Sequence, residues 1–330
     1  MLPELFAGVI LAALVLYALL GGADFGGGVW DLLARGPRAA DQRRVIERAI
    51  APVWEANHVW LILAVVMLFT AFPPAFSAIA IDLHVPLVLM LVGIVLRGSA
   101  FVFRQYGDGG RASTERWGRV FAIASTVTPV VIGVTVGAIT TGARRASGVP
   151  PSTLDLSWLG GFELLVGLFT LALFAFLAAA YLTVEAETPE LRDDFRARAI
   201  GASLGAGVLA GAAALAAGPA TTRFASRLTG SWWSLPLAGL TTAAALGALA
   251  LLYARRFGLA RVVAGSQVVL VLLGWGAAQY PVLVAPDLTI ASAAAPAATL
   301  EVVWPVLIAG SVLLFPSLYW MLRVFKAGQR

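Results

Sequence analysis

Nine apolar stretches of about 20 residues recur along the chain, and this recurrence limits the possible folds more than any other feature. A stretch of that length can cross the hydrocarbon core of a bilayer as one helix, because a helix satisfies its own backbone hydrogen bonds. The stretches lie near residues 5–33, 50–71, 77–103, 119–140, 160–184, 199–217, 234–254, 260–280 and 302–325. The sequence therefore predicts an all-α integral membrane protein with about nine transmembrane helices.

The composition agrees with this prediction, since only 12% of the residues are charged, against about 25% in a typical soluble domain. No long polar segment separates the stretches, so residues 1–330 are expected to form a single polytopic membrane domain. The first stretch lacks the basic segment of a signal peptide and is long enough to span, which predicts a first transmembrane helix rather than a cleaved leader. The chain contains no cysteine, which excludes disulfides and thiolate-bound metals.

Basic residues are divided unequally between the two sets of loops. Eighteen of the 23 Lys and Arg residues fall in loops 35–48, 104–119, 185–198 and 255–261 and in the C-terminal segment, whereas four fall in the alternate loops. Because basic loops stay in the cytoplasm, the sequence predicts an outside N-terminus and a cytoplasmic C-terminus. The same distribution explains the net charge of +5, so no nucleic-acid partner is expected.

The start of the second predicted span carries the strongest functional signal. Its sequence Pro-Val-Trp-Glu-Ala-Asn-His-Val-Trp, residues 52–60, places a carboxylate, an amide and an imidazole within four residues. A charged group costs about 2.5–3.5 kcal/mol at the bilayer centre, so such groups usually face a protein interior, a partner or water. Trp54 and His58 are four residues apart, and Glu55 and His58 are three apart, so all three share one helix face. We predict that this face is functional.

The predicted orientation brings two further charges to the same depth. Asp24 falls in the inner half of the first span and Arg97 in the inner half of the third. With Glu55 and His58 they would form a charge cluster open to the cytoplasm if the three helices are neighbours, as short loops favour. Arg97 is expected to be the counter-ion, and Glu55 is either its partner or a member of a proton relay. The glycines on both sides of Asp24 suit close helix packing.

His58 has three possible roles, as a haem ligand, a relay group or a hydrogen-bonded interior histidine. The chain has only two histidines, and His84 falls near the opposite membrane face. A six-coordinate haem held by histidines needs two that face each other, so no haem is expected on this chain, and no other metal site is predicted. The long loop 281–301 is expected to pack over the outer surface as a lid or a partner contact.

Three motifs together carry a resemblance to a known family. They are Gly-Gly-Ala-Asp-Phe-Gly-Gly-Gly-Val-Trp at 21–30, Ile-Ala-Pro-Val-Trp-Glu-Ala-Asn-His-Val-Trp-Leu-Ile at 50–62, and Gln-Tyr-Pro-Val-Leu-Val-Ala-Pro-Asp-Leu-Thr-Ile at 279–290. They resemble subunit II of the cytochrome bd family of quinol oxidases, and the likeness runs nearly end to end. The third motif especially resembles the cyanide-insensitive branch of that family. Some members have Asp, Gly and Gln where this chain has Glu55, Ala56 and His58. An imidazole titrates near neutral pH and an amide does not, so this difference bears on any relay.

The resemblance implies a division of labour between subunits. Haem b, haem d and the quinol-oxidising loop would belong to subunit I, while this chain would bind no cofactor and carry no catalytic residue. It also implies a proton route from the cytoplasm past Asp24 and Glu55, with Trp54 and His58 alongside. The expected place is the bacterial cytoplasmic membrane, in contact with lipid and quinone. The resemblance leaves open whether a small third subunit is present.

Two other interpretations of the same residues stay open. A proton-coupled secondary transporter would use the cluster to bind its coupling ion, although the sequence shows no convincing inverted repeat with broken helices. An inert assembly scaffold would use it as a buried salt bridge. The preferred prediction is a haem-free subunit II of a quinol:oxygen oxidoreductase in aerobic respiration.

Overall fold

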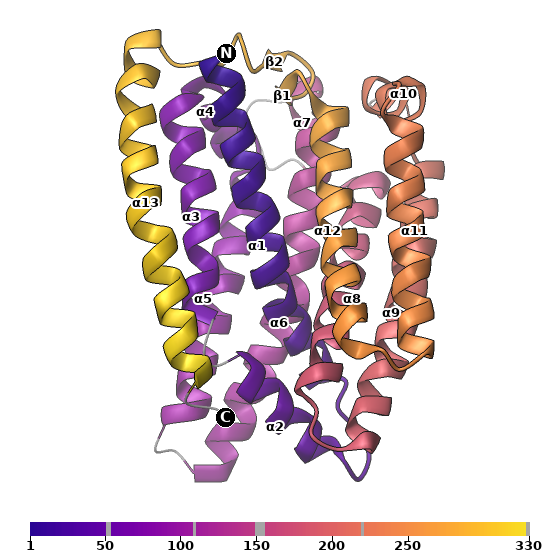
Figure 1. The fold of residues 1–330 in the computed structure, drawn as a ribbon. Coiled ribbons are helices and arrows are strands. Elements are labelled where there is room, and N and C mark those ends of the chain that lie inside the picture. Colours follow the sequence, from indigo (N-terminus) through magenta and orange to yellow (C-terminus); the bar gives the residue numbers. More distant parts are fainter. Residues whose placement is uncertain (51–53, 108–109, 149–155, 219–220, 328–330) are drawn as a thin grey trace.

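The computed structural model describes residues 1–50, 54–107, 110–148, 156–218 and 221–327, without the side chains of 54–56, 111, 321, 322 and 324–327. Helices dominate this part of the chain, and a short β-hairpin precedes the last of them (Figure 1). In order, the elements are α1 (Leu2–Leu32), α2 (Ala39–Ile50), α3 (Trp54–Ala71), α4 (Pro73–Asp82), α5 (His84–Tyr106), α6 (Gly110–Thr141), α7 (Ala143–Ala146), α8 (Gly161–Glu185), α9 (Pro189–Leu215), α10 (Thr222–Gly230), α11 (Ser234–Tyr253), α12 (Phe257–Gln279), β1 (Val282–Val284), β2 (Leu288–Thr289) and α13 (Ala297–Ala327).

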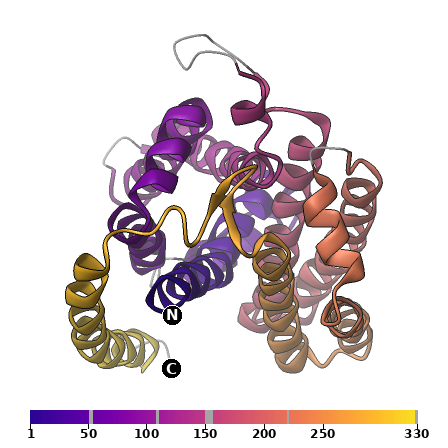
Figure 2. The same cartoon turned by 90° about the horizontal axis from the view of Figure 1, so that it is seen from above.

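The long helices run side by side as one bundle, with α13 along its edge (Figures 1 and 2). Within the described residues, eight helices are long and apolar enough to cross a membrane, and α3 with α4 adds a ninth if that bent pair is counted as one span. The multi-pass all-α fold predicted from the sequence is therefore confirmed. The N-terminus lies at the end of the bundle that carries the β-hairpin, here called the hairpin end (Figure 1). The opposite end, here called the α2 end, holds α2 and the last turns of α13.

Two proline residues end the second span and begin a new helix in another direction. Pro73 and Pro74 begin α4, and proline cannot continue a helix because it lacks the backbone N–H and clashes with the preceding turn. The axis of α4 consequently bends 116° away from α3. The predicted span 77–103 was wrong at its start, because α4 is a separate helix and α5 begins only at His84.

Two segments at the α2 end that were predicted as loops are largely helical. We expected loops at 104–119 and 185–198, but α6 begins at Gly110 and α9 at Pro189. The hydroxyl of Thr188 caps α9 by accepting a hydrogen bond from the Leu191 backbone N–H at 3.3 Å. Hydropathy marks the membrane core and therefore misses such charged helical extensions.

The predicted loop 35–48 contains α2, an amphipathic helix that lies across the α2 end. Arg38 donates to both carboxylate oxygens of Asp194 on α9, at 2.8 and 2.6 Å, and Gln42 donates to the same carboxylate at 2.7 Å. The hydrogen bonds to Asp194 raise the pKa of Arg38 above its ordinary value. These contacts fix α2 beneath the spans and close this end of the core.

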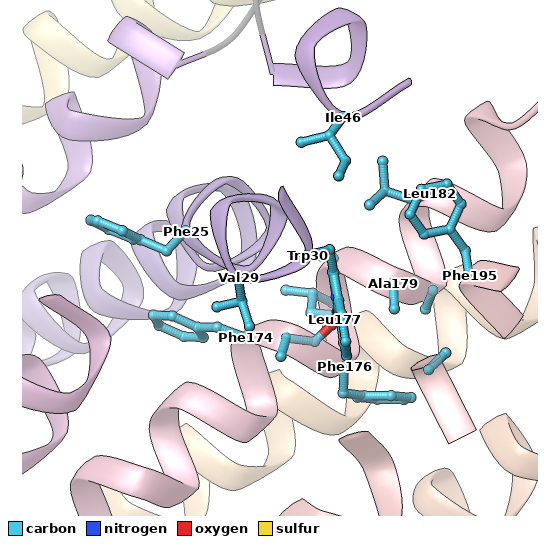
Figure 3. Close-up of a cluster of buried hydrophobic side chains, with 14 of the residues drawn as sticks. Phe25, Val29, Trp30, Ile46, Phe174, Phe176, Leu177, Ala179, Leu182 and Phe195 are labelled. Atoms are coloured by element: carbon cyan, nitrogen blue, oxygen red, sulfur yellow. Dashed lines mark hydrogen bonds between the residues drawn. The ribbon is translucent and has the colours of Figure 1, made fainter. Parts of the chain in front are cut away.

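The largest core cluster lies where α1, α2, α8 and α9 meet (Figure 3). Trp30 reaches from α1 into this cluster, and its indole N–H donates to the Ala175 carbonyl on α8 at 2.7 Å. Ile46 of α2 and Phe195 of α9 belong to the same cluster (Figure 3). Aromatic and aliphatic side chains thus hold α1 against α8, while α3 and α6 also pack on α1 and α5 meets it through ion pairs.

The β-hairpin covers the hairpin end of the bundle (Figure 2). Val282 pairs with Thr289 in its antiparallel ladder. The Ala285 N–H donates to the Ile139 carbonyl of α6 at 3.1 Å, and the Ala295 N–H donates to the Ala71 carbonyl of α3 at 2.8 Å. The expectation that loop 281–301 packs over this surface is confirmed, whereas its role as a partner contact stays a prediction.

Candidate functional site

A buried ion pair joins α1 to α5 inside the bundle. The Asp24 carboxylate pairs with the Arg97 guanidinium, and the two residues are only 4% and 1% exposed. The sequence predicted that Arg97 is the counter-ion of an acid in this layer, and the structure identifies that acid as Asp24. A buried pair avoids the large cost of either charge alone in a medium of low dielectric constant.

Two aromatic rings contact the Arg97 guanidinium. Its central carbon lies 4.8 Å from the ring centre of Phe25 on α1 and 5.3 Å from that of Phe121 on α6. Both rings are themselves buried, so these cation–π contacts are shielded from water. Among the described residues, the Nε of Arg97 has no hydrogen-bond partner. Arg97 is therefore held by one carboxylate and two rings, with unused donor capacity for water.

Helix α3 supplies an amide and an imidazole to the same layer. The side-chain amide of Asn57 donates to the Leu20 carbonyl at 3.3 Å and to the Asp24 carboxylate at a longer 3.5 Å. His58 is half-buried, and its ring centre lies 6.1 Å from that of Tyr17 on α1. Its Nδ1 is buried without a hydrogen-bond partner in the described part of the chain. The structure thus brings Asp24, Asn57 and Arg97 into contact and places His58 beside Tyr17.

Two of the predicted site residues are placed by their backbone alone. Trp54 and Glu55 lie in the first turn of α3, but their side chains are outside the described residues. The backbone places Glu55 one helical turn before His58, on the same face and nearer the α2 end. Its predicted pairing and relay role therefore stay predictions.

The glycines around Asp24 allow three helices to approach α1 closely. A Cβ on Gly26 would overlap the Phe174 carbonyl group of α8, and a Cβ on Gly28 would overlap the Ser125 side chain of α6. A Cβ on Gly27 would lie 2.8 Å from Ile50 of α2, closer than real Cβ atoms come. The predicted role of these glycines in close packing is confirmed.

A second buried pair lies two turns further along α1 and was not predicted. Asp31 is buried, and its Oδ2 accepts a hydrogen bond from Arg104 on α5 at 2.9 Å. Arg43 of α2 approaches the other oxygen at 3.5 Å. Asp31 follows Asp24 by seven residues and Arg104 follows Arg97 by seven, so each pair of like residues shares one helix face. That repeated spacing was the available signal, and it was overlooked because both residues fall at the predicted ends of spans.

The described residues offer no cluster of three His, Asp or Glu side chains that could hold a metal ion. What the site offers instead is a set of buried polar groups. The Asp24–Arg97 pair is neutral as a unit, and unpaired polar atoms of Tyr17, His58 and Arg97 surround it. Buried polar groups of this kind usually bind ordered water. Such an arrangement can hold water and pass protons along it.

The sequence of the chain is similar to those of known proteins. Residues 2–325 match the family profile described as cytochrome bd terminal oxidase subunit II. A Bacillus subtilis chain provisionally described as cytochrome bd menaquinol oxidase subunit II is 23% identical over 98% of this chain and 95% of its own length. The Escherichia coli K12 cytochrome bd-I ubiquinol oxidase subunit 2 is 32% identical over 51% of this chain and 42% of its own.

The fold is also similar to a solved structure. A chain of the bd oxidase from Geobacillus thermodenitrificans superposes with a TM-score of 0.81 and covers 98% of both chains, at 22% sequence identity. The likeness therefore extends over the whole bundle, including the positions of α1, α3 and α5.

Proposed function

This chain belongs to the cytochrome bd terminal oxidase subunit II family, and from that membership we propose that it carries protons toward the oxygen-reducing site of its complex. As a subunit II it is a component of a quinol oxidase. The secondary transporter is not favoured, because the matched relatives are oxidase subunits and the fold follows a bd oxidase over its full length.

In this proposal the partner is subunit I, which binds haem b and haem d and oxidises quinol. This chain supports that subunit and binds no haem itself. Subunit analysis of the purified complex decides whether a small third subunit accompanies the pair, and quinone and lipid meet the complex in the membrane. The proposed location is the bacterial cytoplasmic membrane.

The proposed orientation places the α2 end in the cytoplasm. Two observations support it. The end of the bundle that holds α2 also holds one end each of α5, α9 and α12, and all four helices carry arginines there. The N-terminus lies at the other end (Figure 1). Basic segments next to a span favour the cytoplasmic side. Protons that enter at the α2 end would then come from the cytoplasm.

The single observation that carries the proposal is the buried Asp24–Arg97 pair with Asn57 and His58 beside it. Its neutrality lets water enter the layer without exposing an unpaired charge, and the Asn57 amide orients the carboxylate. In the proposed route a proton enters at Glu55, next to Trp54 at the start of α3, and passes His58 to reach water at Asp24, while Arg97 holds the carboxylate in place. Protons consumed in making water would thus come from the cytoplasm, and those of quinol would leave on the other side. Charge is then separated without a full pump.

The test is Glu55→Gln in the assembled complex. A lost relay group is expected to slow quinol-dependent oxygen uptake by about tenfold or more while the haem spectrum stays intact. Glu163→Gln is the matched control: Glu163 is buried at the hairpin end, where it accepts a hydrogen bond from Thr141 at 2.7 Å, and its loss should leave turnover unchanged. Normal turnover in Glu55→Gln with full haem content would remove Glu55 from any obligatory path.

A further inference from the structure

A polar pocket opens at the α2 end beside the second buried ion pair. It has a volume of about 610 Å³ and lies between α1, α2, α5 and α6. Asp31 and Arg104 line it together with Arg43, and Gly118 and Ala122 contribute from α6. Since one water occupies about 30 Å³ in the liquid, the pocket can hold a cluster of waters around the Asp31–Arg104 pair.

Two matching stripes of residues lead inward from this pocket. On α1 the stripe is Asp31, Gly28 and Asp24, and on α6 it is Gly118, Ala122 and Ser125. Each stripe keeps the three- and four-residue spacing that places side chains on one helix face. We call the contact between them the α1–α6 seam. At 1.5 Å per residue, Asp24 and Asp31 stand about 10.5 Å apart along it.

Ser125 is the innermost residue of the α6 stripe and lies opposite Gly28, the middle residue of the α1 stripe. A Cβ on Gly28 would overlap both the Cβ and the hydroxyl of Ser125, so this hydroxyl occupies the space that the missing glycine side chain leaves. Gly28 lies four residues after Asp24 and three before Asp31 on their shared face. The Ser125 hydroxyl is therefore positioned between the two buried acids.

This hydroxyl differs from its neighbours on α6. The hydroxyls of Thr126, Thr128, Thr135 and Thr140 each donate to the carbonyl four residues earlier, at 2.7 to 2.9 Å. Ser125 is 0% exposed, yet its hydroxyl has no hydrogen-bond partner among the residues described. A buried hydroxyl left unpaired is costly, and ordered water is the usual partner in such places.

We propose that water bound at Ser125 connects the pocket at Asp31 to Asp24, so that the α1–α6 seam is a second branch of proton uptake that meets the α3 branch at Asp24, and full turnover needs both branches. This inference rests on the proposed function and identifies a second place where its protons enter. At each hop one oxygen accepts a proton and releases another to the next, from pocket water through the Ser125 hydroxyl to water at Asp24. No net charge accumulates, and neither ion pair has to break.

The first test compares two hydroxyl deletions on α6 in the assembled complex. Ser125→Ala is expected to slow oxygen uptake by about five- to tenfold, the effect of losing one hydrogen-bonding group from a proton chain. Thr128→Val is the matched control, because Thr128 is equally buried but its hydroxyl is bonded to the Ala124 carbonyl. The control should keep normal turnover. Equal turnover in the two variants would overturn the proposal.

The second test measures water access directly and does not depend on turnover. The chain has no native cysteine, so Ser125→Cys and Ala179→Cys each introduce one thiol into this subunit at a site that is 0% exposed. Silver ion is added from the α2 side of vesicles, and unreacted thiol is counted by mass spectrometry of the peptide. The thiol at 125 should be lost while the one at 179, in the α8 core, persists. Equal survival would overturn the seam.

The two proposals fail in different ways. If Glu55→Gln slows turnover but Ser125→Ala does not, the proton function stands and the α1–α6 seam is excluded as its route. If neither change slows turnover, the proton function of the chain fails as well. A slow Ser125→Ala enzyme whose thiol counterpart stays unreactive would also exclude the seam, because the serine would then act through packing alone.

Discussion

Replacing Arg97 with alanine is expected to destabilise the complex severely. Asp24 would stay buried without its counter-ion, and removal of one partner of a buried pair costs about 3–5 kcal/mol. The contacts with the Phe25 and Phe121 rings would also be lost, at about 0.5–2 kcal/mol each. The sum is a large part of the roughly 5–15 kcal/mol that stabilises a typical domain, so little complex should accumulate.

A double variant separates the charge from the packing. Asp24→Asn with Arg97→Met removes both charges and keeps an unbranched side chain beside the two rings. Neutral replacement of a whole buried pair is often harmless to stability, so the double variant should recover most of what Arg97→Ala loses. The single changes Asp24→Asn and Arg97→Met complete the cycle and give the coupling energy.

The assay is the yield and thermal stability of purified complex, followed by the loss of intact complex in size-exclusion chromatography. A destabilisation of several kcal/mol should lower the midpoint by about 10 °C or more, since 1 kcal/mol corresponds to roughly 2–4 °C for a domain of 150–250 residues. The claim that an unpaired Asp24 destabilises the complex is refuted if Arg97→Ala has the same melting midpoint as the wild type, or if the double variant is as unstable as Arg97→Ala.

Two further predictions concern packing away from the charges. Gly26→Ala should sharply reduce the yield of complex, because its Cβ would overlap the α8 backbone. Gly8→Ala should not, because a Cβ there would have no atom of the described residues within 4 Å; equal yields would contradict the close approach. Arg145→Ala should cost no more than about 1 kcal/mol, since its ion pairs to Asp82 and Asp287 are partly exposed, but it should speed hydrogen exchange in the hairpin. Unchanged exchange would show that these pairs do not fix the hairpin.

The spans and the main buried acid could be predicted from the sequence because membrane insertion is a local rule. Twenty apolar residues identify a span wherever they occur, and a charge such as Asp24 inside one demands a partner. Arg97 was therefore identifiable as a counter-ion. Which acid it pairs with depended on the arrangement of helices, which the hydropathy pattern does not contain.

The other features of the fold and the site were missed because a search for apolar stretches does not detect them. The amphipathic α2 and the charged start of α9 were predicted as loops, because their helices are stabilised by contacts such as Arg38–Asp194 rather than by lipid. The only sequence signal for the Asp31–Arg104 pair was that each of its residues follows the like residue of the first pair by seven positions. Ser125 gave no signal at all, since a lone serine in a span usually bonds its own helix backbone.

The most direct test of the account uses the Asp24→Asn/Arg97→Met complex itself. Reconstituted in vesicles with its haem content matched to wild type, it should be stable yet slow, with oxygen uptake and proton uptake from the α2 side both reduced by about tenfold or more. Full rates of both in a complex without these charges would contradict the account and leave the buried pair as a structural element alone.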